Sequence, residues 1–185
     1  MGLRASPTVE VVLEDVLVPE DARIGEEGTG FSVAMTALDS GRITIGATSV
    51  GLAQAALDVA AGYAVQRKQF DTAIIDFQGV GFMLADMACR IETARLLVHK
   101  AAWLKDHDRA FGPVAAMAKV VSTDAAMAVT TDAVQVLGGY GYTREHPVER
   151  YMRDAKVMQI VEGTNQIQRL VISRSLRQRY GERLG

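Results

Sequence analysis

The first stretch of the chain alternates apolar and polar residues. Val9, Val11 and Leu13 would share one face of an extended segment, and Pro19 and the glycines between 25 and 30 are turn signals. This pattern predicts one or two short β-strands within residues 1–27. Because a lone hairpin is only marginally stable in water, such strands need pairing partners from elsewhere.

Three long helices are predicted after this segment, because apolar positions recur at alternating steps of four and three residues. The first helical face covers 31–63, about nine turns at 3.6 residues per turn. The second covers 77–101, after a break near Asp71. The third covers 113–137, with a proline near its first turn and two glycines at its end, which are the expected start and stop signals.

Two shorter helical segments complete the pattern, one after Pro147 and one over 165–180. Long helices joined by short links favour an antiparallel arrangement. We therefore predict an all-α fold, an antiparallel four-helix bundle over residues 28–185, preceded by the short β segment of residues 1–27.

Composition and charge exclude some classes of protein. The chain has 185 residues, enough for one domain with a substantial core, and its net charge of −2 does not favour a polyanion-binding protein. The last helix does carry several arginines. The acidic pI near 5.9 and the absence of interleaved aromatic residues favour a solvated or intersubunit face over a nucleic-acid site. These arginines are Arg169, Arg174, Arg177, Arg179 and Arg183.

Membrane, metal and redox sites are not predicted. The uncharged stretch 43–57 is too short and too polar to span a bilayer, and no export signal is present at the N-terminus. Cys89 is the only cysteine, which excludes an internal disulfide, and its helical surroundings favour a small buried hydrophobe in a protein from a reducing compartment. The three histidines lack metal-ligand spacing.

Polar residues interrupt the apolar face of the first helix. Arg42 and Ser49 fall on this face, and Asp39 lies three residues before Arg42, close enough to form an ion pair. The spacing favours an intramolecular salt bridge or a side chain that reaches solvent. The alternative is a site for a polar ligand at the bundle surface.

Two loops near the C-terminus could carry chemistry. The glycine-rich turn after residue 137 could let backbone N–H groups approach a phosphate, but without a preceding strand it more often forms a helix C-cap and loop. Glu162 precedes Asn165 and Gln168, which could form a capping box for the last helix. Taken from the residues alone, a loop carboxylate of this kind is usually exposed and inert.

Several segments resemble, in the same order, the C-terminal part of the flavin-dependent acyl-CoA dehydrogenases. The most specific are "LDSGRITIGA", "YAVQRKQF", "QVLGGYGYTREHPVERYMRDAKV" and "VEGTNQIQRLVISR". The resemblance implies that residues 1–27 are the last strands of a truncated middle β-domain and that residues 28–185 form the C-terminal helical domain of such an enzyme.

The resemblance also implies a reaction and a set of site residues. Glu162 matches the family's catalytic base, which removes the α-proton of an acyl-CoA thioester while a hydride passes to FAD, giving a trans-2-enoyl-CoA. Gly41 stands where some relatives carry an alternative base, which favours Glu162 as the only one. The substrate contacts implied are Asp39, Arg42 and Gly163. The FAD contacts implied are Arg67, Gln78, Gln135, Gly138, Gly139, Thr164 and Gln166.

Partners and location follow from the same resemblance. In the family, the residues matching Arg67, Gln78 and the loop 135–139 usually contact the flavin of a neighbouring subunit, which implies a homo-oligomer, a dimer or tetramer. An electron-transfer flavoprotein would accept the electrons. We expect a bacterial cytoplasm, or a mitochondrial matrix in a eukaryote, and an isolated chain that is inactive. The alternative function is a catalytically inactive helical oligomerisation or interaction domain; Glu162, Arg42 and Arg67 favour the enzyme.

Overall fold

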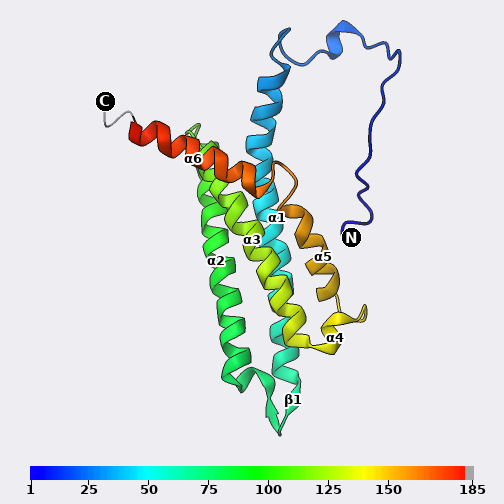
Figure 1. The fold of residues 1–185 in the computed structure, drawn as a ribbon, viewed down its shortest axis with the longest axis vertical. Coiled ribbons are helices and arrows are strands. Elements are labelled where there is room, and N and C mark those ends of the chain that lie inside the picture. The colour runs from blue at the N-terminus through cyan, green and yellow to red at the C-terminus, as the bar shows by residue number, and fades with distance from the viewer. Residues whose placement is uncertain (182–185) are drawn as a thin grey trace.

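Three long helices form the body of the molecule, and each runs antiparallel to the one before it in the chain (Figure 1). The computed structural model describes residues 1–181, so Arg183 and the last four residues of the predicted bundle domain lie outside the described residues. The long helices are α1 (Gly30–Gln66), α2 (Gln78–Asp106) and α3 (Gly112–Leu137). Helix α3 packs against both α1 and α2. The predicted helical bundle is confirmed.

Shorter helices complete the bundle. After the single turn α4 (Gly139–Tyr142), α5 (Val148–Met158) packs against α3 and α1 as the fourth, shorter member. Helix α6 (Asn165–Gly181) then crosses α3 near that helix's first half and points away from the bundle (Figure 1). The turn between α5 and α6 is therefore placed over the long helices.

Small residues let the long helices approach closely. The buried apolar side chains of α1 and α3 are mostly alanines, with Met87 and Ile91 of α2 filling the larger spaces. At Gly46 of α1 an added Cβ would lie 3.0 Å from Val98 of α2 and 3.2 Å from Ser122 of α3. Close packing of this kind leaves little room for volume changes in the core.

The N-terminal segment is where the sequence prediction was wrong. Residues 1–29 form one turn of 3₁₀ helix, η1 (Glu20–Ala22), and no strand. Val9, Val11 and Leu13 are 70%, 76% and 77% exposed. The physical reason is that no neighbouring strand within the described residues can pair with this segment.

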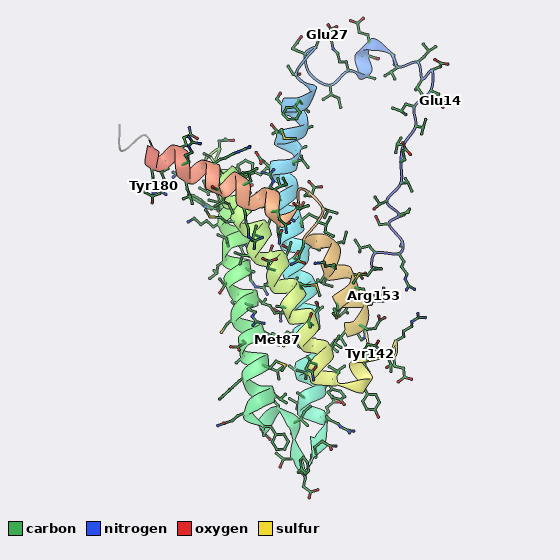
Figure 2. The ribbon with its side chains drawn as sticks, in the orientation of Figure 1. Glu14, Glu27, Met87, Tyr142, Arg153 and Tyr180 are labelled. Atoms are coloured by element: carbon green, nitrogen blue, oxygen red, sulfur yellow. The ribbon has the colours of Figure 1, made fainter. Side chains whose placement is uncertain are left out.

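The N-terminal segment is nevertheless anchored at its beginning. It leaves the start of α1, carries Glu27 and Glu14 away from the bundle, and returns to α5 near Arg153 (Figure 2). The backbone N–H of Leu3 donates to Asp154 at 2.6 Å, and Arg153 donates to the carbonyl of Met1 at 2.7 Å. The predicted domain division after residue 27 stays a prediction.

A small hairpin between α1 and α2 was not predicted. Strands β1 (Lys68–Gln69) and β2 (Thr72–Ala73) pair antiparallel, followed by the 3₁₀ turn η2 (Ile74–Asp76). The two turn residues, Phe70 and Asp71, both have positive φ, 51° and 60°. Such a turn favours Asn-Gly or Asp-Gly, so Phe-Asp gave no sequence signal.

Two further expectations concern exposure. Cys89 was predicted to be buried, but it lies on the exposed face of α2 beside the buried stripe of Met87 and Ile91. Helix α1 is long and apolar enough to cross a membrane by length and composition alone. The core helix of a helical bundle passes the same test, and α1 packs against α2 and α3 here.

Candidate functional site

Glu162 lies in the tight turn that joins α5 to α6. Its φ is +54° and that of Gly163 is +85°, so two consecutive residues adopt the left-handed conformation. The turn is closed by a backbone hydrogen bond of 3.0 Å from Asn165 to the carbonyl of Gln159. A left-handed conformation costs a residue with a Cβ about 1–2 kcal/mol, so the surrounding contacts must hold Glu162 in place.

The carboxylate of Glu162 lies against helix α1 at Gly41. A Cβ added at Gly41 would sit 2.9 Å from the Glu162 carboxyl carbon and would meet Oε2 more closely than van der Waals contact allows. Glycine therefore provides the space that the carboxylate occupies. Within residues 1–181 the carboxylate of this half-buried residue forms no hydrogen bond or ion pair, so both oxygens are available to a ligand.

Arg42 and Asp39 form the ion pair that the sequence predicted, on the same turn of α1 as Gly41. Arg42 is 7% exposed, and its Nη1 donates to Asp39 Oδ1. Its Nε is buried and has no acceptor among the described residues. An unpaired buried donor is energetically unfavourable, so this atom is a candidate contact for a polar ligand.

Two buried side chains hold the Glu162 turn from behind: one was not singled out from the sequence, and the other was expected only in a capping box. Lys119 of α3 donates from Nζ to the carbonyl of Gly163 at 3.0 Å and to Oδ1 of Asn165 at 2.8 Å. Gln168 of α6 donates from Nε2 to the carbonyls of Glu162 and Gly163, both at 3.0 Å. Both side chains are completely buried.

Burial lowers the pKa of Lys119 to about 8. Desolvation is the largest cause, because an ammonium group loses its hydration inside the bundle. The carboxylates of Asp124 and Glu162 oppose this shift, and the guanidinium of Arg42 adds to it. The Lys119 ammonium group and the Glu162 carboxylate therefore interact electrostatically, although they are not hydrogen-bonded to each other.

Asn165 docks the start of α6 on α3, and this corrects the capping-box prediction. Its Nδ2 donates to Thr123 at 2.9 Å and to Asp124 at 2.7 Å. Thr164 caps the helix instead, since its hydroxyl accepts the N–H of Ile167 at 3.3 Å. The side chain of Gln168 points back into the Glu162 turn and not to the helix cap.

The predicted FAD contacts fall into two separate groups. Thr164, half-buried, and Gln166, exposed, lie beside Glu162 at the start of α6. The other group lies at the opposite end of the bundle, near β1 in Figure 1. From Arg42 to Arg67 the chain rises through 25 helical residues, about 38 Å at 1.5 Å per residue. The distant group consists of Arg67, Gln78, Gln135, Gly138 and Gly139.

Two residues of the distant group, Arg67 and Gly139, line an open hollow of about 410 Å³. Tyr140 also lines it, and the guanidinium of Arg67 lies 6.0 Å from the centre of the Tyr140 ring. Gly138 ends α3 with φ +60°, and a Cβ at Gly138 or Gly139 would meet nothing within 4 Å. The hollow is open, and the Arg67 guanidinium and the accessible glycine backbone could contact an anionic group, although the carboxylate of Glu145 also lines it.

Comparisons with known proteins identify the family of this chain. The family profile described as "Acyl-CoA dehydrogenase, C-terminal domain" matches residues 28–177. The chain belongs to the acyl-CoA dehydrogenase family. The "Acyl-CoA dehydrogenase, short-chain specific" of Clostridium acetobutylicum is 51% identical over 173 residues, 94% of this chain and 46% of that protein.

Solved structures of the family share the fold. The butyryl-CoA dehydrogenase of Megasphaera elsdenii superimposes with a TM-score of 0.88 at 52% identity, covering 89% of this chain and 43% of that one. A structure reported for the electron transferring flavoprotein of Acidaminococcus fermentans gives the same score, identity and coverage. The chain thus spans about half the length of the acyl-CoA dehydrogenases it matches.

A signal for Lys119 was present in the sequence. It lies four residues after Ala115 and three before Ser122, on the buried stripe of α3, as Arg42 does on α1. A charge on a core stripe needs a partner, and that argument could have singled out Lys119. The partners themselves are not predictable, because they come from a turn more than forty residues away.

Proposed function

We propose that this chain supplies the catalytic base, and part of the substrate and flavin contacts, of an FAD-dependent acyl-CoA dehydrogenase. The observation that carries the proposal is the free carboxylate of Glu162 lying on Gly41, one residue before the buried Arg42. Family membership, and similarity to a butyryl-CoA dehydrogenase, support an acyl-CoA thioester as substrate.

Glu162 would remove the proton on the carbon next to the thioester. A general base must reach its proton within about 3 Å and must be unprotonated when the substrate arrives. The Glu162 carboxylate has no hydrogen bond or ion pair within the described residues that would compete with the substrate for it. The side chain of Ile160 is 53% exposed, so an apolar wall around the base would have to be completed by groups outside this chain.

Arg42 and Asp39 would position the polar part of the substrate. The Nε of Arg42 lacks an acceptor, and Asp39 already fixes the guanidinium through Nη1. A ligand carbonyl or hydroxyl placed near this turn of α1 would remove the unpaired donor. Gly163, whose conformation leaves its backbone next to the base, would lie beside the thioester.

The residues present fit FAD as two partial sites. The hollow at Arg67 suits the anionic part of a dinucleotide, since it combines a guanidinium with accessible glycine backbone. Thr164 and Gln166 lie beside the base, close to the Arg42 turn of α1, which is separated from Arg67 by about 38 Å of helix. When bound, FAD would accept the β-hydride. One cofactor would contact both groups only if a second copy of the chain supplied one of them, which supports a homo-oligomer.

An electron-transfer flavoprotein is the proposed electron acceptor, supported by similarity to a chain in the structure reported for the electron transferring flavoprotein of Acidaminococcus fermentans. The bacterial relatives support our proposal that the protein acts in a bacterial cytoplasm.

The test uses a fusion protein in which this chain replaces the matching C-terminal portion of the Megasphaera elsdenii butyryl-CoA dehydrogenase. Turnover of butyryl-CoA is measured with an artificial electron acceptor. We expect Glu162→Gln to lower kcat by at least about 100-fold, within the range of general-base contributions, with the flavin absorbance unchanged. Glu92→Gln, an exposed carboxylate on α2, is the matched control and should behave as wild type.

Two results would contradict the proposal. A Glu162→Gln fusion with normal turnover would mean that another group is the base. A wild-type fusion that binds flavin but does not oxidise butyryl-CoA would favour the alternative, a helical interaction domain without catalysis.

A further inference from the structure

Lys119 is a completely buried ionisable side chain behind the Glu162 turn. It lies on α3, and its ammonium contacts the carbonyl of Gly163 and the side chain of Asn165. Arg42 on α1 and Asp124 on α3 are the other charged groups close enough to affect it, besides Glu162 itself. Burying an ammonium group costs several kcal/mol unless its surroundings compensate.

The need to give the Gly163 carbonyl and Asn165 Oδ1 a hydrogen-bond donor does not by itself explain why a lysine is buried at position 119. The carbonyl of Gly163 also accepts Nε2 of Gln168 at 3.0 Å, and Oδ1 of Asn165 also accepts the Thr123 hydroxyl at 3.2 Å. The Gly163 carbonyl would thus keep a donor if Lys119 were replaced by an apolar residue. Asn165 Oδ1 would keep one if the Thr123 hydroxyl proton turned to it from the Lys119 carbonyl at 2.7 Å. Replacing buried charges with well-packed apolar residues is often neutral or stabilising, so an ammonium group here calls for a role other than stability.

The turn that Lys119 holds is conformationally strained. Glu162 has a positive φ, and Gly163 has one at which a Cβ would lie 2.6 Å from Nε2 of Gln168. Lys119 of α3 and Gln168 of α6 both donate hydrogen bonds to backbone carbonyls of this turn. Two donors on different helices therefore fix the carbonyl of Gly163 in position. Glu162, the residue before Gly163, is the one whose carboxylate lies against Gly41.

We propose that Lys119 is a positioning residue for Glu162: its buried ammonium group clamps the Gly163 carbonyl and Asn165, and so aims the Glu162 carboxylate over Gly41. This inference rests on the proposed function, because it assigns Lys119 a role in the reaction of Glu162. Lys119 does not touch the substrate and acts only through the turn. A misplacement of about 1 Å in a catalytic group can lower the rate roughly 100-fold.

The experiment compares Lys119→Met with wild type in the fusion protein, using butyryl-CoA as the probe. We expect kcat to fall roughly 10- to 100-fold, whereas KM, the thermal midpoint and the flavin content per chain stay near their wild-type values. A purely structural role would instead lower the thermal midpoint and flavin content. Lys100→Met, an exposed lysine on α2, is the matched control and should leave kcat unchanged.

A conservative variant separates charge from bulk. Lys119→Arg keeps the positive charge and several donors, and we expect it to restore most of the kcat lost in Lys119→Met. If Lys119→Met does not bind flavin, Lys119→Gln, which is smaller and neutral, takes its place under the same criteria.

Each outcome decides the inference separately from the proposed function. Wild-type kcat in the neutral variant, together with loss of turnover in Glu162→Gln, would overturn the positioning role and leave Glu162 as the base. A loss of kcat that parallels a loss of thermal midpoint or flavin would also overturn it. Retained turnover in Glu162→Gln would contradict the proposed function itself, whatever Lys119→Met shows.

Discussion

Replacing Gly41 by alanine should separate activity from stability at the candidate site. The new Cβ would lie 2.9 Å from the carboxyl carbon of Glu162 and 3.5 Å from Oε1, and closer still to Oε2. No other atom is that close, and the Glu162 carboxylate ends a flexible side chain, so the carboxylate would move and the helix backbone would stay.

The expected free-energy change can be worked out from two opposing contributions. Alanine in a helix interior is about 1 kcal/mol more favourable than glycine. Forcing Glu162 off its rotamer costs about 0.5–1.5 kcal/mol. The free energy of unfolding should therefore change by less than about 1 kcal/mol. Displacing the carboxylate should nevertheless lower kcat roughly 100-fold, the usual consequence of misplacing a catalytic group.

Gly51 offers a matched control on the same helix. It is exposed, and a Cβ there would meet nothing within 4 Å. Gly51→Ala should stabilise the 185-residue chain by about 1 kcal/mol in urea unfolding and leave the kcat of the fusion protein unchanged. Normal kcat in Gly41→Ala would refute the placement of the base on Gly41. Destabilisation by more than about 2 kcal/mol would show that the backbone, and not the carboxylate, gives way.

Three further predictions concern pH, backbone and cofactor. Because the pKa of Lys119 is about 8 when folded and 10.5 when unfolded, the folded state binds fewer protons between these values, and stability should rise with pH across that window. In urea unfolding, the free energy of unfolding of wild type should rise by about 2 kcal/mol from pH 7 to 9.5. Lys119→Met should lack this rise and Lys100→Met should keep it; the same pH dependence in wild type and Lys119→Met would contradict the prediction. Gly163→Ala places a Cβ at φ +85° and 2.6 Å from Gln168, and should destabilise the chain by at least about 1–2 kcal/mol in the same assay, whereas an unchanged midpoint would show that the turn can relax. Arg67→Ala should weaken FAD binding by the fusion protein, measured by flavin absorbance, and Glu162→Gln should not. If Arg67→Ala bound FAD as tightly as wild type, the Arg67 hollow would be excluded as a flavin contact.

The helices were predictable because their signals are local. Apolar residues at helical spacing, Pro113 near the first turn of α3 and Gly138 at its end gave the long helices to within a few residues. The ion pair of Arg42 with Asp39 was likewise predictable, since both partners lie on one helix three residues apart. Local spacing therefore determined the scaffold and one element of the site.

The remaining features depend on partners far away in the sequence. Alternation at Val9, Val11 and Leu13 indicates a strand only if another strand pairs with it, and none of the described residues does so. Asn165 looked like a helix cap, but Thr123 and Asp124 of α3 bind its side chain. Helix packing created those contacts, so no pattern within the C-terminal segment could reveal them.

Helix α1 relates the two halves of the proposed site. Gly41 and Arg42 lie beside the base, and Arg67 follows the end of the same helix about 38 Å away. A rigid helix of this length cannot bend to bring both ends to one cofactor, and α3 packs along it to prevent such a change. If both ends bind flavin, each chain must contribute to two different flavin sites. Oligomerisation would then be a condition for the activity, and mutations at Arg67 should affect a base located on another copy.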